Sequence, residues 1–563
     1  SIKEQAVDAT TISSFNFTNV RKNNITGKRL KPWSIENFDV SYSYTRSEHH
    51  SPIAEEDELI LYKGGLGYNY VGTAKYWEPF KKRIKSRSKW LTIFKDFNLN
   101  PIPSILTFRA DINRQFGAFR SRNIDGPKGV LPETYNKFFT FDRLYVLRWD
   151  ITRSINIDLT ATNKAWVDED SGRLDHAGRK DMWANFWKGG RTVLYQQAAN
   201  FTYTLPTNKI PLIDWTTVRA AYGSTYQWTT ASLLATSLGN TIQNTQKIEL
   251  TGDFNFNRLY NKWGLLKALD LSSSPNSNTQ TPGVKRPDTA RNRPKQEEPN
   301  QGYQLHGVVK GLARILTMLK DVSVNYSENS LSSIYGYTDS TRFLGMNWKT
   351  GEPGLGYVFG GQPDTAFVNK LGKNGKLTTD TTFNFQNQAA YTQLINISAQ
   401  LQPVRDMNIT INLNKTFGKN YTELYKDTLS NGSFARLNPY TAGSFSISFI
   451  AVNTLFENFK PNEISNTFKT FQNNRLIISE RLGTANPYSG IQGSDGYYKG
   501  YGKYAQDVLI PAFIAAYSGK DAHSVALINQ DNSSIRSNPF SGYLPKPNWR
   551  ISYNGLSRVP GLY

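Results

Sequence analysis

The sequence predicts an all-β fold in which antiparallel strands form a transmembrane β-barrel with short helical insertions. In about thirteen segments, apolar residues recur at every second position, as in strands with one apolar and one polar face. Most of these segments run for roughly 10 to 16 residues. Strands of soluble proteins usually stop near 5 to 6 residues, whereas a strand that crosses a bilayer needs ~9–11. Alternation and segment length together favour the barrel.

Two segments show the alternation clearly and supply the residues that we expect to face lipid: Ile155, Ile157, Leu159, Ile409, Ile411 and Leu413. The second segment follows residues 395–401 across a tight polar turn, which predicts a β-hairpin. Elsewhere the alternate positions carry charge. A sandwich could expose such a face to solvent, whereas a large barrel turns it toward a wet lumen. The proposed lumen-facing residues are Arg109, Asp111, Asp158, Arg219, Glu249 and Asp253.

The connections alternate in length, as in outer-membrane barrels, which have short turns at one end and long loops at the other. The compact set is residues 150–153, 205–212 and 403–406, and the long set is 121–137, 166–190, 336–377 and 420–442. Amphipathic segments at 89–100 and 313–325 enlarge two connections on the short-turn side. Aromatic residues near segment ends, Tyr226 and Trp228 among them, predict a girdle at each membrane interface.

Two stretches break the strand pattern. Residues 271–300 contain almost no apolar residue, which is typical of a flexible linker. From 453 to 548 the period becomes helical, with one face formed by Ile464, Phe468, Phe471, Leu476 and Ile477. The predicted organisation is transmembrane strands over 1–260 and 321–452, a periplasmic linker with an amphipathic helix over 261–320, a helix and loop insertion over 453–548, and the start of a further strand region over 549–563.

Composition narrows the functional classes. The 563 residues include no cysteine, which excludes disulfides, thiol nucleophiles, iron–sulfur clusters and cysteine-ligated zinc. A net charge of +21 could attract nucleic acid, but that function needs clustered cations. The densest basic run, at residues 81–89, is better explained as a solvated face, so we expect no nucleic-acid partner. The chain opens at Ser1 without an apolar leader, which predicts a processed chain or an excised piece.

No catalytic or metal-binding constellation emerges from the sequence. His49 and His50 are adjacent, so their rings point to opposite faces of a strand and do not suit a shared metal ion. The glycines at 64–67 lie inside a strand-like stretch, where a bend or close packing of another backbone is a better explanation than a phosphate-binding loop. We therefore expect no enzyme activity, no cofactor and no metal.

Several motifs carry a family resemblance. Two of them, DVLIPAFIAAYSG and PNWRISYNGL, contain these residues: Asp507, Pro511, Phe513, Tyr517, Gly519, Pro547, Asn548, Trp549 and Gly555. Further motifs are GGLGYNY at 64–70, KDFNLN at 95–100, NRLY at 257–260 and GLGYVF at 354–359. Together they cover nearly the whole chain, and they resemble the SprA/Sov family, which forms the outer-membrane translocon of the type IX secretion system of Bacteroidota.

The resemblance implies a segment from near the C-terminal end of one very large antiparallel barrel. Its function would be to form part of a pore that exports folded proteins and supports gliding motility. The implied partners are a plug protein, a smaller PorV-like barrel that closes a lateral opening and accepts cargo, other periplasmic translocon components, secreted cargo proteins and outer-membrane lipid. The expected location is the cell outer membrane.

Two other classes stay open. One is a smaller closed barrel of about fourteen strands, porin-like or fatty-acid-transporter-like, in which the first and last strands would pair. The other is a secreted β-rich adhesin or glycan-binding protein, in which the apolar faces would pack on each other. Burial of the six proposed lipid-facing residues distinguishes the adhesin from a membrane protein.

Overall fold

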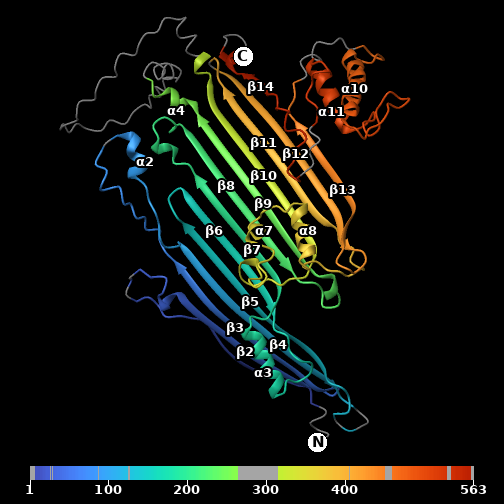
Figure 1. Ribbon diagram of the computed structural model, residues 1–563. Coiled ribbons are helices and arrows are strands. Elements are labelled where there is room, and N and C mark those ends of the chain that lie inside the picture. The colour runs from blue at the N-terminus through green and yellow to red at the C-terminus, as the bar shows by residue number, and fades with distance from the viewer. Residues whose placement is uncertain are drawn as a thin grey trace, which may run out of the picture.

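In the computed structural model, one large antiparallel sheet is the main element of the fold (Figure 1). The structure describes residues 7–263 apart from 26, 28, 87, 124–126 and 128, then 315–450 apart from 405, 460–528, and 534–558. The predicted linker at 271–300 lies outside the described residues, as does most of the 261–320 region.

The strands are long and the helices are short. The strands are β1 (Ala9–Val20), β2 (Phe38–His50), β3 (Ala54–Val71), β4 (Ile105–Ser121), β5 (Thr134–Asp150), β6 (Ile155–Trp166), β7 (Arg191–Thr204), β8 (Thr216–Thr229), β9 (Asn240–Asn255), β10 (Leu319–Tyr337), β11 (Asn387–Leu401), β12 (Met407–Asp427), β13 (Phe434–Ile447) and β14 (Asn548–Tyr553). The α-helices are α2 (Thr92–Lys95), α3 (His176–Trp187), α4 (Phe256–Tyr260), α7 (Leu355–Val358), α8 (Thr365–Lys373), α10 (Asn466–Ala485) and α11 (Gln506–Ser518). The 3₁₀ helices are η1 (Ile35–Asn37), η2 (Lys89–Leu91), η3 (Thr207–Lys209), η4 (Thr236–Leu238), η5 (Phe343–Gly345) and η6 (Gly555–Arg558).

Each strand from β1 to β12 pairs with the next strand along the chain, and β14 pairs with β12. The predicted hairpin at 395–413 is confirmed as β11 and β12, with Leu401 opposite Ile409. Among the described residues β1 pairs only with β2, so the sheet is open. The predicted all-β antiparallel architecture is confirmed, whereas closure into a barrel stays a prediction.

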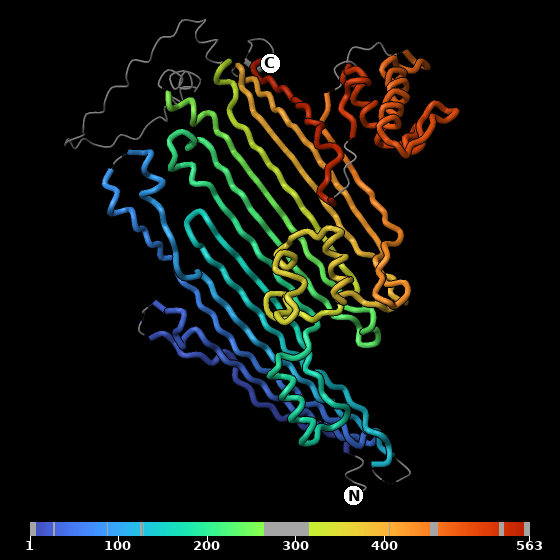
Figure 2. Tube along the Cα trace, viewed as in Figure 1, coloured from blue at the N-terminus to red at the C-terminus, as the bar shows by residue number. Residues whose placement is uncertain are grey.

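The strand order places the connections at two ends of the sheet. One end, which we call the short-turn end, carries residues 21–37, 72–104, 151–154, 205–215 and 402–406, and also the described residues 256–263 after β9. The other, which we call the long-loop end, carries 51–53, 122–133, 167–190, 230–239, 338–386 and 428–433. Figure 2 shows the connection 338–386, in yellow, folding back over one face of the sheet. At the long-loop end, at least one connection therefore folds back over the strands.

The predicted long loop at 420–442 is wrong. Strand β12 continues to Asp427 and β13 begins at Phe434, which leaves only 428–433 as a turn. The strands extend because their side chains find partners: Tyr425 stacks on Phe434 with ring centroids 5.3 Å apart, and Arg436 pairs with Glu423. A polar sequence is thus held in the sheet by contacts that local composition does not reveal.

The two amphipathic segments do not share a structure. Residues 89–95 form η2 and α2, whereas in the second segment only 315 and 316 are helical among the described residues. Leu319 already begins β10, because Val322 and Val324 pair with both β9 and β11. The shared pattern therefore yields a helical turn at one site and the start of a strand at the other.

Strands β13 and β14 occupy one strand position, end to end along β12. β13 pairs with β12 over 415–427 and β14 pairs with it over 407–412, both antiparallel. Between them the Ser448 hydroxyl donates to the Lys546 carbonyl at 2.7 Å, and the Lys546 N–H donates to the Ser448 carbonyl at 2.9 Å. The insertion at 448–547 therefore leaves and re-enters the sheet in the middle of one strand position.

Within this insertion, α10 and α11 pack on each other beside β13 (Figure 1). Ile478 and Leu482 of α10 are buried with Val508 and Ala512 of α11. Small side chains on α11 allow this close approach, because alanine adds little bulk at the contact.

The predicted face of the first helix is wrong in part. Ile464 precedes α10, and Phe468 and Leu476 are exposed. The buried face includes polar residues instead: the Ser479 hydroxyl donates to the Tyr501 carbonyl at 2.7 Å. A buried serine with a hydrogen-bond partner satisfies its polarity, so apolar periodicity alone selects the wrong face.

The connection 338–386 covers strands β7 to β10 near the long-loop end and forms the largest core. Tyr357, Val358 and Leu371 pack there against strand residues Ile242 and Ile334. Asn244, fully buried on β9, donates to the carbonyls of Tyr357 and Gly361, both at 2.8 Å. A buried amide that satisfies two loop carbonyls fixes the connection to the sheet.

This core overturns one predicted interface girdle. Tyr226 and Trp228 are 1% and 3% exposed and lie beneath the 338–386 connection, so they do not form an exposed aromatic band. The Trp228 indole N–H donates to the Asp339 carbonyl at 3.1 Å. These aromatic residues near a strand end pack in a core. Their position in the sequence does not distinguish that role from anchoring at a membrane interface.

We predict that Leu371→Ala loosens the 338–386 connection. Leu371 is fully buried in the core, so truncation should lower the free energy of local opening by about 2–5 kcal/mol. Hydrogen exchange of the amides of α8 measures this opening. Leu355→Ala is the matched control, because Leu355 is 45% exposed and its truncation should change that free energy by less than ~0.5 kcal/mol. Equal protection in the two variants would contradict the assigned packing.

Candidate functional site

Pairing across the sheet decides the face of every strand residue. Residues directly opposite each other in neighbouring strands point to the same side. From Leu159 an unbroken register reaches Lys419 of β12 through Ala199, Ser224, Gln246, Ser330 and Tyr391. Leu413 lies at an even spacing from Lys419 on the same strand. The six predicted lipid-facing residues therefore share one face, which we call the apolar face.

The six predicted lumen-facing residues lie on the opposite face, which we call the polar face. Arg109 is opposite Leu144, and Leu144 is opposite Thr162, which shares its face with Asp158. The same register places Asp111 beside Arg109, and Arg219, Glu249 and Asp253 on that side. The structure thus separates the two predicted sets completely. That one face meets lipid and the other a lumen stays a prediction.

Charges on the polar face pair with near neighbours while staying in contact with solvent. Arg109 donates to Asp111 at 2.7 Å, and Lys247 pairs with Glu249. Ser323 donates its hydroxyl to Asp253 at 2.7 Å. Exposed pairs of this kind stabilise a fold by only ~0–1 kcal/mol. Their main effect is to keep a hydrated surface of mixed charge along the strands.

The predicted strand through residues 64–67 is confirmed, because these glycines lie inside β3. A Cβ atom at Gly65 would stand 2.9 Å from Oδ1 of Asp111, and one at Gly67 would clash with the Asp39 carboxylate. Both glycines lie on the polar face, where they leave room for the acidic side chains of the neighbouring strands. Close packing therefore explains the motif, with side chains rather than a backbone approaching the glycines.

The half of the apolar face nearer the short-turn end forms a continuous apolar surface, which we call the belt. Its members on successive strands are Leu66, Leu106, Phe108, Leu147, Ile155, Ile157, Leu159, Phe201, Val218, Ala220, Ile248, Leu250, Val322, Val324, Ile395, Ile397, Ile409, Ile411 and Leu413. None of these described residues is buried. The belt is therefore an apolar surface that lies open along its length.

Exposed aromatic side chains gather in the connections at the short-turn end. The clearest are Trp33, Trp77, Trp90, Phe94 and Trp263. Sequence reasoning placed the girdle at strand ends and missed these residues. The available signal was the high share of aromatic residues in connections that are otherwise basic and polar, at 72–104 above all.

The other half of the apolar face is covered by connections from the long-loop end. Near α3, Phe139 is buried with Val167 and Met182. Arg173 donates to Glu133 at 2.7 Å and to Glu58 at 3.0 Å, and its hydrogen bond to Glu133 raises the pKa of Arg173. Ion pairs and buried aromatic side chains thus hold these connections against this half of the apolar face.

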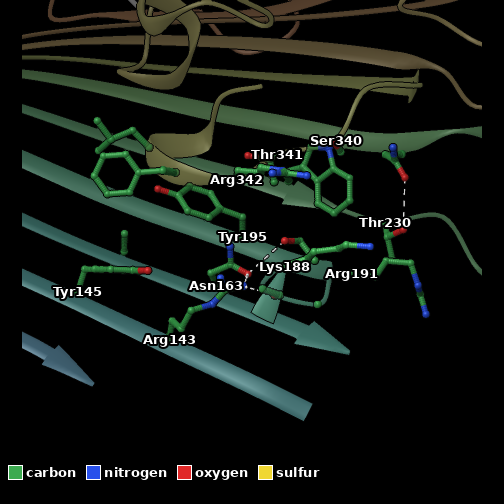
Figure 3. Close-up of a pocket in the computed structure, with 18 of the residues that line it drawn as sticks. Arg143, Tyr145, Asn163, Lys188, Arg191, Tyr195, Thr230, Ser340, Thr341 and Arg342 are labelled. Atoms are coloured by element: carbon green, nitrogen blue, oxygen red, sulfur yellow. Dashed lines mark hydrogen bonds between the residues drawn. The ribbon is translucent and has the colours of Figure 1, made fainter. Parts of the chain in front are cut away.

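A cavity of about 590 Å³ lies on the apolar face between strands β5 to β8 and the two connections 167–190 and 338–386 (Figure 3). We call it the cationic cavity, because its lining includes Arg143, Lys188, Arg191 and Arg342. Figure 3 shows Arg143, Asn163 and Tyr195 on the sheet, with Ser340 and Thr341 on the segment that faces them. Leu159 and Ala161 also line it, so the cavity adjoins the belt.

Asp339 holds the wall of this cavity that the 338–386 connection supplies. Its carboxylate accepts from Thr350 at 2.6 Å and from Lys376 at 3.0 Å. Burial alone would raise the pKa of Asp339. These hydrogen bonds, together with one from Asn347, instead lower that pKa below its usual range. An ionised Asp339 therefore stabilises the segment that carries Thr341.

No metal centre or membrane-spanning helix is found in the described residues. His49 lies 3.0 Å from Asp8 and 3.3 Å from Asp57, yet no group of three or more potential ligands in this part of the chain could hold a metal ion. No described helix is long and apolar enough to cross a bilayer.

The motif residues of the family resemblance lie in two places. Asp507, Pro511, Phe513 and Tyr517 are on α11, where the rings of Phe513 and Tyr517 stack 4.2 Å apart, and Gly519 ends the helix in a left-handed conformation. Pro547 leads into β14, which contains Asn548 and Trp549, and Gly555 begins η6. The chain matches no known family model, and no curated protein is significantly similar to it.

We predict a pH-dependent effect of Asp339→Asn. Because the folded state lowers the pKa of Asp339, its stabilisation is complete at neutral pH and is lost as pH falls through that lowered value. The variant should lower the free energy of opening of the 338–386 connection by ~1–3 kcal/mol at pH 7, and the difference should begin to shrink as pH falls below about 4, the ordinary pKa of an aspartate. Hydrogen exchange across this pH range measures it.

The control is Asp181→Asn, because Asp181 is an exposed residue of α3. Its substitution should leave the same opening free energy unchanged. A difference between wild type and Asp339→Asn that stays constant down to pH 3 would contradict the role given to the ionised carboxylate.

Proposed function

We propose that this chain forms part of the wall of a protein-conducting pore in the outer membrane, as the resemblance to the SprA/Sov translocons implies. The separation of a polar and an apolar face, which the pairing of neighbouring strands preserves from β3 to β12, carries the proposal. On this proposal the belt meets lipid and the polar face lines an aqueous channel for folded cargo of type IX secretion. Export through it would support gliding motility.

The dimensions of the belt support a membrane position. On β9 the belt residues Ile248 and Leu250 are followed on the same face by Phe254, which lies about 20 Å along the strand from Ile248, at ~3.3 Å per residue. Exposed aromatic residues of the short-turn connections extend this surface toward the ~25 Å apolar band of outer-membrane barrels. Their tryptophan rings suit the membrane interface, because they combine an apolar body with a polar N–H.

The open sheet favours a segment of a larger barrel over a small closed one. A porin-like barrel built from this chain would need hydrogen bonds between β1 and the β13 and β14 position, and the described residues contain none. An adhesin would bury the belt against a second sheet, yet Ile157 and Ile411 stay partly exposed. Both edges of this sheet would then continue into neighbouring strands of the same pore.

The thirteen strands here would form only part of the circumference of the proposed pore, which would therefore be wide. A wide pore leaks unless partner proteins close it. The proposed partners are a periplasmic plug protein, a PorV-like barrel and other periplasmic components of the translocon. Secreted cargo would pass along the polar face.

The absence of cysteine allows a direct test by single substitutions in the full chain. We predict that Ile157→Cys and Ile411→Cys, once labelled with a fluorophore, are quenched by brominated lipids. Arg219→Cys and Glu249→Cys should instead react with a water-soluble, membrane-impermeant maleimide, because they lie on the polar face. Rates of labelling and quenching in outer-membrane vesicles measure both.

Lys180→Cys is the control, because Lys180 is an exposed residue of α3 and should label with the water-soluble reagent whichever way the faces point. Rapid aqueous labelling of Ile157→Cys and Ile411→Cys would sink the membrane assignment. Slow aqueous labelling of Ile157→Cys and Ile411→Cys without quenching by brominated lipids, together with rapid labelling of Arg219→Cys and Glu249→Cys, would favour the adhesin.

A further inference from the structure

The side chains that line the cationic cavity carry a positive charge that no acidic residue of the lining balances. Its lining includes four cations and no carboxylate. Asp168, outside the lining, pairs with Arg191 through two hydrogen bonds of 2.9 and 3.0 Å. Within the described residues Lys188 and Arg342 form no ion pair, and Arg143 is held by neutral oxygens, at 3.1 Å from Asn163 and 2.9 Å from the Gly189 carbonyl. Three cations therefore face one cavity without an acidic partner.

Two buried polar atoms at the cavity also lack a partner. Thr341 is 2% exposed, and its hydroxyl has no hydrogen-bond partner within the described chain. The Nε of Arg143 is likewise buried and unpartnered. A buried hydroxyl or guanidinium N–H that forms no hydrogen bond costs about 1–3 kcal/mol. Thr341 and Arg143 lie on opposite walls of the cavity, so a small rotation of either side chain would bring its unpartnered atom to a ligand that accepts hydrogen bonds.

We infer that the cationic cavity binds a phosphate-bearing ligand. A phosphate oxygen accepts bonds from guanidinium groups in a forked geometry and from hydroxyl groups, which matches Arg143, Arg342 and Thr341. The cavity volume of about 590 Å³ lies within the usual range of ligand sites, so it can hold a phosphate together with the sugar that carries it. Tyr195 and Trp228, both almost fully buried, supply apolar parts of the cavity wall.

Position selects between two sources of this phosphate. The cavity adjoins the end of the belt, and Leu159 belongs to both. A lipid with its acyl chains along the belt would therefore bring its headgroup phosphate to Arg143 and Lys188. Because long loops mark the outer side of outer-membrane barrels, the lipid would be the phosphorylated glycolipid of the outer leaflet. Free phosphate is the other source. The anion site rests on the cavity alone, whereas the lipid source rests on the proposed function.

Equilibrium binding to the purified full chain in a non-ionic detergent tests the inference. The probes are inorganic phosphate, lipid A with its two phosphates, and the same lipid after removal of both phosphates. Wild type should bind lipid A at least tenfold more tightly than the dephosphorylated lipid. In Lys188→Gln with Arg342→Gln, affinity for lipid A should fall at least tenfold, because two exposed cations of the cavity are removed without a change in the core.

The matched control is Lys180→Gln with Lys349→Gln, which removes the same charge from exposed positions outside the cavity. It should bind as wild type does. Binding of inorganic phosphate as tight as that of lipid A, lost in the cavity variant, would support the anion site with free phosphate as its source. Equal affinities of the cavity variant and wild type for every probe, or no binding of any probe, would overturn the inference. None of these outcomes depends on where the belt lies in the cell.

Discussion

The hydrogen-bond register between neighbouring strands is the constraint on which the rest of this structure depends. Side chains alternate with a period of two, so a slip of one residue between two strands would exchange the faces of every strand beyond it. The register shifts that do occur lie near strand ends, as between Leu319 and Asp321 and between Thr422 and Leu424. From β7 through β9 the pairing has none. The separation of the two faces is therefore preserved across the sheet.

The apolar face meets two different requirements along one strand. Toward the short-turn end it presents aliphatic residues that stay open, and toward the long-loop end it presents residues that the connections cover. Ile248 and Asn244 illustrate the change on β9. Ile248 belongs to the belt, whereas Asn244 is buried and its side-chain amide donates two hydrogen bonds to the connection. The cationic cavity lies where these two halves meet, which explains how one site combines apolar walls with basic residues.

The split strand position formed by β13 and β14 solves a related problem. An insertion of a hundred residues at a strand end would add to the crowded connections, whereas this insertion leaves beside β12 and packs against the sheet through Phe540 and Phe445, whose rings stack 4.2 Å apart. Hydrogen bonds between Ser448 and Lys546 close the gap in the ladder. The strand position is therefore occupied along its length although the chain is interrupted there.

The sequence by itself determined the strands, their antiparallel order and the two faces, because an alternation of period two is a local signal that every strand repeats. Residues as far apart as Ile155 and Leu413 could be assigned to one face before the register was known. Tertiary structure alone decided what covers that face. Tyr226 and Trp228 look like interface anchors in sequence but lie in a core, since a connection more than a hundred residues away returns over them. The cationic cavity was equally hidden, because its arginines come from separate strands and loops whose meeting depends on long-range packing.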